Sequence, residues 1–332
     1  MTRVKWGILS TAKIGTDLVI PALQKSPDIE VAAIASRSLA KAKRVAAALG
    51  IAKAYGSYEA LLADPEIEVI YNPLPNHLHV ALTLAAARAG KHVLCEKPMA
   101  MTAAEARALR QAPKGRLIQE AFMIRHAPQW LEVKRLVKAR AIGEVKLVQA
   151  YFSYFNRDPK NVRNMAAIGG GGLLDIGCYP MTAARFIFGA EPLRVASVLE
   201  RDPAFKTDRV LSALADFGRG RQLSFAISTQ LAQSQRLNII GSTGRIDVEI
   251  PFNAPIDRPT RIFVQGPKLY EGEWRTFPAS DQYQLQGEAF SRAVRKAEKL
   301  AYGVDNAIAN MAALDAIARA AKSGKWEKVR KV

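Results

Sequence analysis

Short apolar runs alternate with helical patterns along the first third of the chain. Apolar runs at residues 4–9 and 30–35 predict buried strands, and further strands are expected at 53–55, 68–71, 91–95 and 116–122. Helical patterns between them cover residues 14–25, 38–50, 57–62, 77–89 and 102–111, with Ser38 placed as a cap and glycines at positions 50 and 90 as stops. This alternation predicts a doubly wound parallel sheet with right-handed crossovers.

The rhythm changes after residue 122. A helix is expected at 128–140, an alternating strand at 144–155 and a helix at 175–188. Strand-like runs follow at 194–200, 210–217, 222–230 and 236–240, with hairpin turns at 218–221 and 241–244. An Ala-rich helical tail covers 284–322. We therefore predict an α/β protein with a Rossmann domain at 1–122 and an α+β domain at 123–332 that holds a large, open, mostly antiparallel sheet. Its last helices are free to pack on the first domain.

Length and composition are those of a globular protein. The 332 residues suit about two domains, with 49% hydrophobic and 23% charged residues. No apolar run reaches the ~18 residues of a membrane span, and the amino-terminal stretch lacks the apolar core and cleavage site of a signal peptide. The two cysteines, Cys95 and Cys178, are too few for a disulfide framework, which favours a reduced, cytoplasmic setting.

The net charge of +18 and the pI near 10.0 raise the question of a polyanionic partner. The basic residues are scattered through segments such as 41–44, 134–140 and 325–331, without a basic tail or an interleaved aromatic stripe. This scatter favours solvated faces and attraction of small anionic ligands over nucleic-acid binding.

The stretch GILSTAKIG at 7–15 lies where a Rossmann fold places its phosphate-binding turn. In that turn, backbone N–H groups and a helix N-terminus face the pyrophosphate, and three glycines give a tight turn, a close approach and close packing. Only Gly15 of the three is present here. The strand–turn–helix context nevertheless predicts cofactor contacts by the turn residues, which are Ser10, Thr11, Ala12, Lys13 and Ile14. Ala12 is tolerable at the close approach if its φ stays negative.

The end of the second predicted strand bears on the choice between NAD and NADP. NAD-preferring sites place Asp or Glu there, but this chain has Ser36, Arg37 and Ser38. An arginine with flanking hydroxyls would bind a 2′-phosphate through charge-assisted hydrogen bonds, so NADP is the preferred cofactor. The alternative is that Arg37 is an ordinary exposed loop residue and Ser38 only a helix cap.

A lysine stands at the carboxyl end of another predicted strand. The sequence HVLCEKPMA at 92–100 places Lys97 where such folds bind ligands, and Pro98 fixes the backbone beside it. There Lys97 would reach a nicotinamide or a reacting oxygen. Read alone, the Glu-Lys-Pro sequence is also compatible with a polar turn.

The second candidate cluster follows a run of four glycines at 169–172. With a helix starting near Asp175, Asp175 and Tyr179 stand at i and i+4 and share one face. A nearby ammonium group lowers the pKa of a tyrosine and makes it usable as an acid or base, as hydride transfer at a carbon bearing oxygen requires. The residues Lys97, Asp175 and Tyr179 thus form a plausible catalytic set. The alternative is a half-buried core tyrosine and an aspartate that caps the helix.

Taken together, these segments resemble the Gfo/Idh/MocA oxidoreductase family, named for glucose–fructose oxidoreductase and inositol dehydrogenase. The resemblance runs nearly end to end and depends on the segments 7–15, 72–101 and 161–181. It implies a Rossmann half that binds NAD(P) and an open-sheet half that forms the substrate pocket and the oligomer contacts. A homodimer or homotetramer is expected from it.

The resemblance also implies roles for single residues. Lys97 matches the active-site lysine of the family's Glu-Lys-Pro motif, with Glu96 and Pro98 beside it. Many members have Asp-x-x-x-His in the second motif, and this chain has Tyr179 at the histidine position, as in glucose–fructose oxidoreductase, dimeric dihydrodiol dehydrogenase and NADP-linked xylose dehydrogenases. Further matches to segments near the cofactor or pocket are Pro73, Asn76, His77, His79, Arg163 and Trp130, of which Trp130 is equally well explained as a core residue.

The expected function is an NADP(H)-dependent oxidoreductase acting on a sugar or a related polyhydroxylated alcohol or carbonyl compound. Tyr179 would exchange a proton with the substrate oxygen, Lys97 would lower its pKa and contact substrate or cofactor, and Asp175 would orient the substrate hydroxyl or the Lys–Tyr pair. Two alternatives remain: an NAD(P)-dependent glycosidase of the same fold, and a non-catalytic NADP-binding sensor. We expect no metal site, since His77 and His79 are two apart at a helix start and point to different faces.

Overall fold

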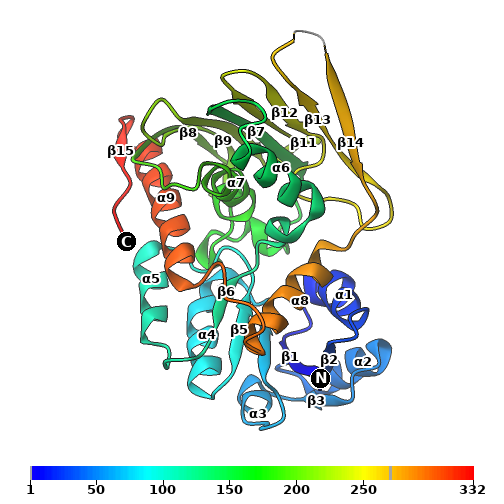
Figure 1. Cartoon of the computed structure of the whole chain (residues 1–332). Helices are drawn as coiled ribbons and strands as arrows, with labels where there is room; N and C mark the ends of the chain where they lie inside the picture. The colour runs from blue at the N-terminus through cyan, green and yellow to red at the C-terminus, as the bar shows by residue number, and fades with distance from the viewer. Residues whose placement is uncertain (1, 269–270) are drawn as a thin grey trace. The chain divides into compact units, whose positions relative to one another are not determined.

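The structure is a computed structural model that describes residues 2–268 and 271–332. Contacts divide the chain into two compact units (Figure 1). The first runs from the amino terminus to Met123 and includes Asp281–Ile308, and the second comprises Ile124–Ser280 and Ala309–Val332. The predicted boundary at 122 lies one residue before the point where the chain first passes from one unit to the other, after Met123. The prediction had placed 281–308 in the second domain while leaving its helices free to pack on the first, and this segment makes its contacts in the first unit.

The first unit contains a six-stranded parallel sheet in the order β3-β2-β1-β4-β5-β6. The sheet is buried on both sides, so β1 and β2 are apolar almost throughout. Trp6 of β1 lies in its core, packs edge-on against Phe290 and donates a hydrogen bond to Ser291 Oγ at 3.1 Å. The strands are β1 (Val4–Leu9), β2 (Ile29–Ala35), β3 (Lys53–Tyr55), β4 (Val69–Asn72), β5 (His92–Cys95) and β6 (Ile118–Glu120).

Helices connect these strands in the predicted order. Local signals fix their ends: the side chains of Ser38, Ser57 and Thr102 cap three of the helices, and Gly50 ends the first of these in the left-handed conformation at φ 65°. The helical segments are η1 (Ile14–Val19), α1 (Ile20–Gln24), α2 (Leu39–Leu49), α3 (Tyr58–Leu62), η2 (Asn76–Leu78), α4 (His79–Arg88), α5 (Ala103–Arg107), η3 (Ala108–Gln111) and α8 (Gln282–Val294).

The second unit is built on a nine-stranded sheet in the order β14-β13-β12-β11-β7-β10-β9-β8-β15. The described pairings are antiparallel except that of β7 with β10, which is parallel. The strands are β7 (Val145–Phe155), β8 (Arg194–Arg201), β9 (Asp208–Asp216), β10 (Gln222–Ser228), β11 (Gln230–Gly241), β12 (Arg245–Val248), β13 (Thr260–Gln265), β14 (Gly272–Phe277) and β15 (Glu327–Lys328).

One face of this sheet is covered by helices and the other carries exposed side chains. Buried and exposed positions alternate along β7 and β9, as a half-buried strand requires. Helix α7 packs against β7 and β10, and α6 packs against α7 and β13. The helical segments are η4 (Met123–His126), α6 (Pro128–Lys138), η5 (Val162–Asn164), η6 (Ala166–Ile168), η7 (Leu173–Gly177), α7 (Cys178–Phe188) and α9 (Val304–Ser323), whose residues up to Ile308 belong to the first unit.

The predicted fold class is confirmed, with corrections in the last third. Strands β12, β13 and β14 were not predicted, although Ile262 and Val264 alternate with Arg261 and Phe263 along β13. The tail predicted as helical over 284–322 consists of two helices, α8 and α9, separated by a charged segment that ends at Gly303. The turns predicted at 218–221 and 241–244 do join antiparallel pairs, β9 with β10 and β11 with β12.

Candidate active site

The turn between β1 and η1 replaces the missing glycines in two different ways. Ser10 itself adopts the left-handed backbone, with φ 74°, and its Oγ accepts a hydrogen bond from the N–H of Ala12 at 3.2 Å. Ala12 is not among the residues with positive φ, which meets the condition set for it above. The side chain of Lys13 at the helix N-cap makes no capping bond. Gly15 N and Thr16 N already donate to Ala12 O at 2.9 and 3.0 Å, so the N–H groups that precede them in the turn are the ones that an anion would meet.

Gly15 lies in η1 beside the end of β4. A Cβ atom at this position would be 3.7 Å from Pro73 Cγ and 3.8 Å from Tyr71 Cε1, which are ordinary van der Waals distances. Gly15 therefore lies where η1 approaches β4, but there is room for a methyl group at this position.

The end of β2 carries hydroxyls and a cation. Ser36 is buried, and its Oγ accepts from the N–H of Ser38 at 3.3 Å, while Ser38 Oγ caps α2 by accepting from Lys41 N at 3.3 Å. Arg37 is exposed. Its positive charge acts on Tyr58, where it opposes the larger effect of burial, which raises the pKa of that phenol. The cation therefore lies among polar groups at the carboxyl edge of the sheet.

The loop after β4 is organised by buried polar groups. The amide of Asn72 donates to the carbonyl oxygen of His79 and to Thr83 Oγ1, each at 3.2 Å, and its oxygen accepts from Leu74 N at 3.3 Å. His79 is 1% exposed, and its ring contacts only backbone carbonyls in the bonds described. The His79 ring thus lies between two backbone carbonyls, and its expected contact with a cofactor stays a prediction. Pro73, Asn76 and His77 belong to the same loop.

The loop after β5 holds Lys97 through its neighbours. Tyr71 donates its hydroxyl to Glu96 Oε1 at 2.7 Å, and Lys97 N donates to Glu96 Oε2 at 3.3 Å. Burial, reinforced by Glu96, raises the pKa of Tyr71, which keeps this donor protonated. Met99 N donates to Oε1 of the buried Glu120 at 2.7 Å, and the Lys97–Pro98 peptide is cis.

In the second unit, the glycine run is required by close packing. A Cβ at Gly170 would lie 2.7 Å from the carbonyl oxygen of Arg163, and Gly171, at φ 123°, is packed against the carboxylate of Asp208. That carboxylate accepts from the N–H of Leu173, the first residue of η7. Burial raises the pKa of Asp208, and the bonds from the Leu173 and Gly172 amides oppose this shift. A buried acid thus occupies the start of the helix that carries Asp175.

Asp175 is not a helix cap, because the helix begins two residues earlier than predicted, at Leu173. Its Oδ2 accepts from Tyr154 Oη at 2.6 Å and from Arg163 Nε at 2.9 Å. Burial, reinforced by the charge of Asp175, raises the pKa of Tyr154. Arg163, expected near the cofactor, is thus bound to Asp175. The helix starts with a π turn, so the i and i+4 spacing to Tyr179 departs from regular α geometry.

Tyr179 is 4% exposed and lies against two aromatic rings. Its ring centroid is 5.8 Å from that of Phe152 and 5.5 Å from that of Phe252. The backbone that carries Phe252 is fixed by Trp130, whose Nε1 donates to Pro251 O at 2.6 Å, and by Gln235, whose Oε1 accepts from Phe252 N at 2.9 Å. Trp130 is therefore a buried residue that positions this segment.

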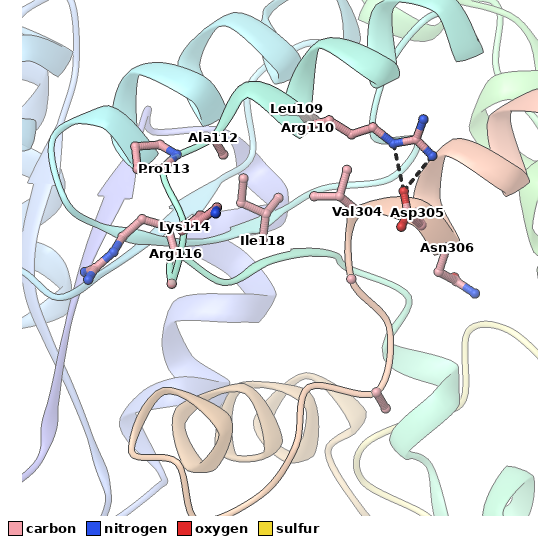
Figure 2. Close-up of a pocket in the computed structure, with 13 residues that line it drawn as sticks. Leu109, Arg110, Ala112, Pro113, Lys114, Arg116, Ile118, Val304, Asp305 and Asn306 are labelled. Atoms are coloured by element: carbon pink, nitrogen blue, oxygen red, sulfur yellow. Dashed lines mark hydrogen bonds and ion pairs between the residues drawn. The ribbon is translucent and has the colours of Figure 1, made fainter. Parts of the chain in front are cut away.

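A groove of about 640 Å³ also lies in the first unit, at the amino end of β6. Figure 2 shows Arg110 facing Asp305 across it, with a distance of 2.9 Å from Nε to Oδ1. The predicted cofactor residues follow the carboxyl ends of β1, β2, β4 and β5, at the opposite edge of the sheet. The groove is therefore not the predicted cofactor site.

The sequence-predicted residues fall into two groups. The first unit brings the segments 10–14, 36–38, 73–79 and 96–98 to one edge of its sheet, and the second unit joins Arg163 to Asp175 and places Tyr179 on the same helical segment. The pairing of Lys97 with Tyr179 stays a prediction. Residues that the sequence reasoning missed are Tyr71, Glu120, Tyr154, Asp208 and Phe252. Of these, Glu120 had a readable signal, an acid at the end of a predicted strand of the parallel sheet.

Among the described residues, no three His, Cys, Asp or Glu side chains gather as metal ligands do. The same part of the chain has no helix that is both long and apolar enough to cross a bilayer.

Comparison with known proteins agrees with this architecture. Residues 4–117 match the model of an oxidoreductase family with an NAD-binding Rossmann fold, GFO/IDH/MocA, and residues 130–247 match a GFO/IDH/MocA C-terminal domain. The chain is 46% identical to an uncharacterized oxidoreductase of Rhizobium meliloti, over 99% of this chain and 100% of the relative. It is 36% identical to a D-xylose 1-dehydrogenase (NADP⁺) of Haloferax volcanii, over 96% of this chain and 98% of that one.

A 3-ketoreductase of Actinomadura kijaniata, solved in complex with NADP and TDP-benzene, has a similar structure. Its TM-score is 0.89 at 30% identity, over 96% of this chain and 98% of that one. Other solved structures of the same enzyme carry a Tyr-to-Phe or a Lys-to-Ala substitution.

Proposed function

Since the chain belongs to the Gfo/Idh/MocA family of oxidoreductases, we propose that it transfers hydride between NADP(H) and a sugar or a related polyhydroxylated alcohol or carbonyl compound. The observation that carries this proposal is the loop Glu96–Met99, which is held by Tyr71 and Glu120 at the carboxyl edge of the nucleotide-binding sheet. Relatives named as a xylose dehydrogenase and a sugar-nucleotide 3-reductase support the substrate class.

The residues of the β1 turn fit the pyrophosphate of such a cofactor. The N-terminus of η1 lacks a side-chain cap. Ser10, in the left-handed conformation, turns the chain between β1 and this helix. When bound, the nicotinamide cofactor carries the hydride.

The end of β2 favours NADP. Segment 35–38 has no carboxylate that would repel a 2′-phosphate, and Arg37 is exposed between two serines. We expect Arg37→Ala to raise the KM for NADP by roughly 10- to 100-fold, as loss of a charge-assisted hydrogen bond of about 1.5–3 kcal/mol predicts. The KM for NAD serves as the control, because NAD lacks the phosphate. An equal change in both constants would remove Arg37 from this role.

Three residues carry the proton chemistry in the proposal. Tyr179 gives a proton to, or takes one from, the substrate oxygen as the hydride moves. The Lys97 ammonium stabilises the phenolate and lowers its pKa, and Asp175, fixed by Tyr154 and Arg163, orients the substrate hydroxyl. The aromatic rings of Phe152 and Phe252 limit the positions open to the Tyr179 ring.

The test is a panel of aldoses, polyols and diols incubated with NADP and, in parallel, with NAD, with reduction followed by absorbance. We expect net NADP reduction with at least one substrate, and a fall in turnover of about 10²–10⁴-fold in Tyr179→Phe with little change in NADPH binding. Near-wild-type turnover in that variant would remove Tyr179 from the acid/base role. Hydrolysis of a glycoside without net NADPH formation would indicate the glycosidase reaction instead, and binding without turnover a sensor.

A homo-oligomer is part of the same proposal. The outer face of the nine-stranded sheet exposes apolar side chains on β7, β8 and β9, with Tyr151 42%, Val198 76% and Leu214 49% exposed. Such a face favours a dimer or tetramer, which light scattering after gel filtration would detect. Cys95 and Cys178 are buried and not joined in a disulfide, which suits the reduced cytoplasmic setting proposed for the protein.

A further inference from the structure

His79 joins the two loops that follow β4 and β5. Its Nδ1 lies 2.7 Å from the carbonyl oxygen of Pro98, and its Nε2 lies 2.6 Å from the carbonyl oxygen of Leu74. The ring is 1% exposed, so no solvent competes for these contacts. One side chain therefore spans from the segment after β4 to the residue that follows Lys97.

In these contacts the histidine ring is the hydrogen-bond donor and the backbone carbonyls are the acceptors. Carbonyl oxygens only accept hydrogen bonds, so every bond at the ring is donated by histidine: a neutral ring donates to one carbonyl, and a protonated ring donates to both. The backbone of His79 is fixed in turn, since its own carbonyl oxygen accepts from the buried amide of Asn72 at 3.2 Å. The ring is thus anchored before it reaches Pro98.

The link completes a set of restraints around Lys97. Glu96 is held by the Tyr71 hydroxyl, Pro98 by the His79 ring, and Met99 by the Glu120 carboxylate. Glu96 N also donates to Asn72 O at 3.0 Å, so backbone groups are held on both sides of Lys97, and the Lys97 Cα with them. The direction in which its side chain leaves the loop is therefore set by groups that do not contact the ammonium in any of these bonds.

We propose that His79 is a positioning residue for Lys97: by bonding the carbonyl of Pro98 it sets where the lysine ammonium stands for the reaction. This inference rests on the proposed function, in which Lys97 lowers the pKa of Tyr179. A displacement of about 1 Å at such a group can cost roughly 10²-fold in rate.

His92 offers a matched control in the same sheet. Its side chain is partly buried, and its ring is bound to backbone as that of His79 is, since Leu117 N donates to its Nδ1 at 2.9 Å. It stands at the amino end of β5, three residues before the carboxyl end that leads to Lys97. Replacing His92 removes a comparable bond without touching the loop 96–99.

The experiment compares the full-length variants His79→Phe, His79→Gln and His92→Phe. We expect His79→Phe to lower kcat about 10- to 100-fold with the KM for NADP changed less than about threefold, and His79→Gln, which keeps a donor, to recover most of the loss. His92→Phe should lower the melting temperature but leave kcat within about twofold of wild type. A purely structural role of His79 would move the melting temperature alone.

A second readout does not require turnover. Competitive acetylation with acetic anhydride, read by mass spectrometry, reports the reactivity of the Lys97 amine against the exposed Lys114 as internal reference. The Lys97 to Lys114 ratio should change in both His79 variants, less in His79→Gln, and stay constant in His92→Phe. If neither kcat nor this ratio distinguishes the His79 variants from His92→Phe, the positioning role is wrong. If the ratio responds but wild type reduces no NADP with any substrate, the proposed function fails while the positioning role stands.

Discussion

Two helices, one in each unit, begin next to predicted site residues, and their starts differ. Both open with a π-helical turn, Ile14–Val19 in the first unit and Leu173–Gly177 in the second, and continue as α-helix. The first start has no side-chain cap. At the second, the buried carboxylate of Asp208 accepts the Leu173 N–H.

This difference separates two uses of a helix N-terminus. A start without an internal acceptor carries partial positive charge that an incoming phosphate can use. A start already bonded to a buried acid has no such capacity, and its bonds hold the helix in place. Under the proposed function, the first start binds the phosphate of the cofactor, and the second start holds the helical segment that carries Asp175 and Tyr179 in place. Substitutions at Asp208 and in the glycine run should therefore loosen the start of the second helix.

The largest effect is expected from Gly171→Ala. The added Cβ would overlap the Asp208 carboxylate, and φ 123° is a conformation that alanine avoids. Strain and displacement together should lower the free energy of unfolding by about 2–5 kcal/mol, measured by urea denaturation. Gly50→Ala is the control, since Gly50 also has positive φ, 65°, but a Cβ there meets nothing within 4 Å. Its loss should stay near 1 kcal/mol; equal losses would show that packing against Asp208 contributes nothing.

Asp208→Ala should have the next largest effect. It removes the acceptor of the Leu173 amide, and a buried N–H left without a partner costs about 1–3 kcal/mol. Because the same helix carries Tyr179, turnover should fall as well, whereas Asp208→Asn keeps an oxygen acceptor and should lose less on both counts. If Asp208→Ala leaves both the denaturation midpoint and kcat unchanged, Asp208 does not hold this helix in place.

The pH dependence of stability should have opposite signs at two groups, the partly buried His92 of the first unit and the buried Asp208 of the second. Burial lowers the pKa of His92 to about 4, so between the ordinary value near 6.5 and about 4 the unfolded chain binds the proton more readily and stability falls as pH falls. Burial raises the pKa of Asp208, so above the ordinary Asp value near 3.9 the folded chain holds the proton more readily and this group adds stability as pH falls.

Urea midpoints from pH 7 to pH 4.5 would measure both contributions. Relative to wild type, His92→Gln should lose less stability on acidification, by about 1–2 kcal/mol, and Asp208→Asn should lose more. Parallel curves for all three proteins would show that neither group titrates differently in the folded chain.

The sequence predicts those helices and strands whose signals lie within a few neighbouring residues. Ser38 followed by a helical pattern gave α2, and the alternation of strands with helices gave the parallel sheet, because each signal lies within a few residues. The candidate residues of the first unit lie at one edge of the sheet, because they follow the carboxyl ends of parallel strands, which all lie at that edge.

Other features of the two helix starts depend on contacts between segments that are distant in the sequence, and these were not predicted. The two π turns appear as ordinary helix in a hydrophobic pattern, so the second helix was started at Asp175 instead of Leu173. Asp208 lies 35 residues beyond Leu173, and no local pattern pairs an acid with a distant amide. No local pattern predicts that the His79 ring lies against the carbonyls of Leu74 and Pro98, 5 and 19 residues away.

The smallest effect is expected from Gly15→Ala, in the first of the two helices. The new methyl group would meet Pro73 and Tyr71 at 3.7 and 3.8 Å, so nothing has to move. Alanine is also the better helix former by about 1 kcal/mol, so stability should be unchanged or slightly higher, with NADP affinity within about threefold of wild type. A loss above about 2 kcal/mol would show that this helix packs on β4 more closely than the structure has it. With the predicted result, the first turn tolerates a methyl group at its one remaining glycine, whereas the second turn tolerates none at Gly171.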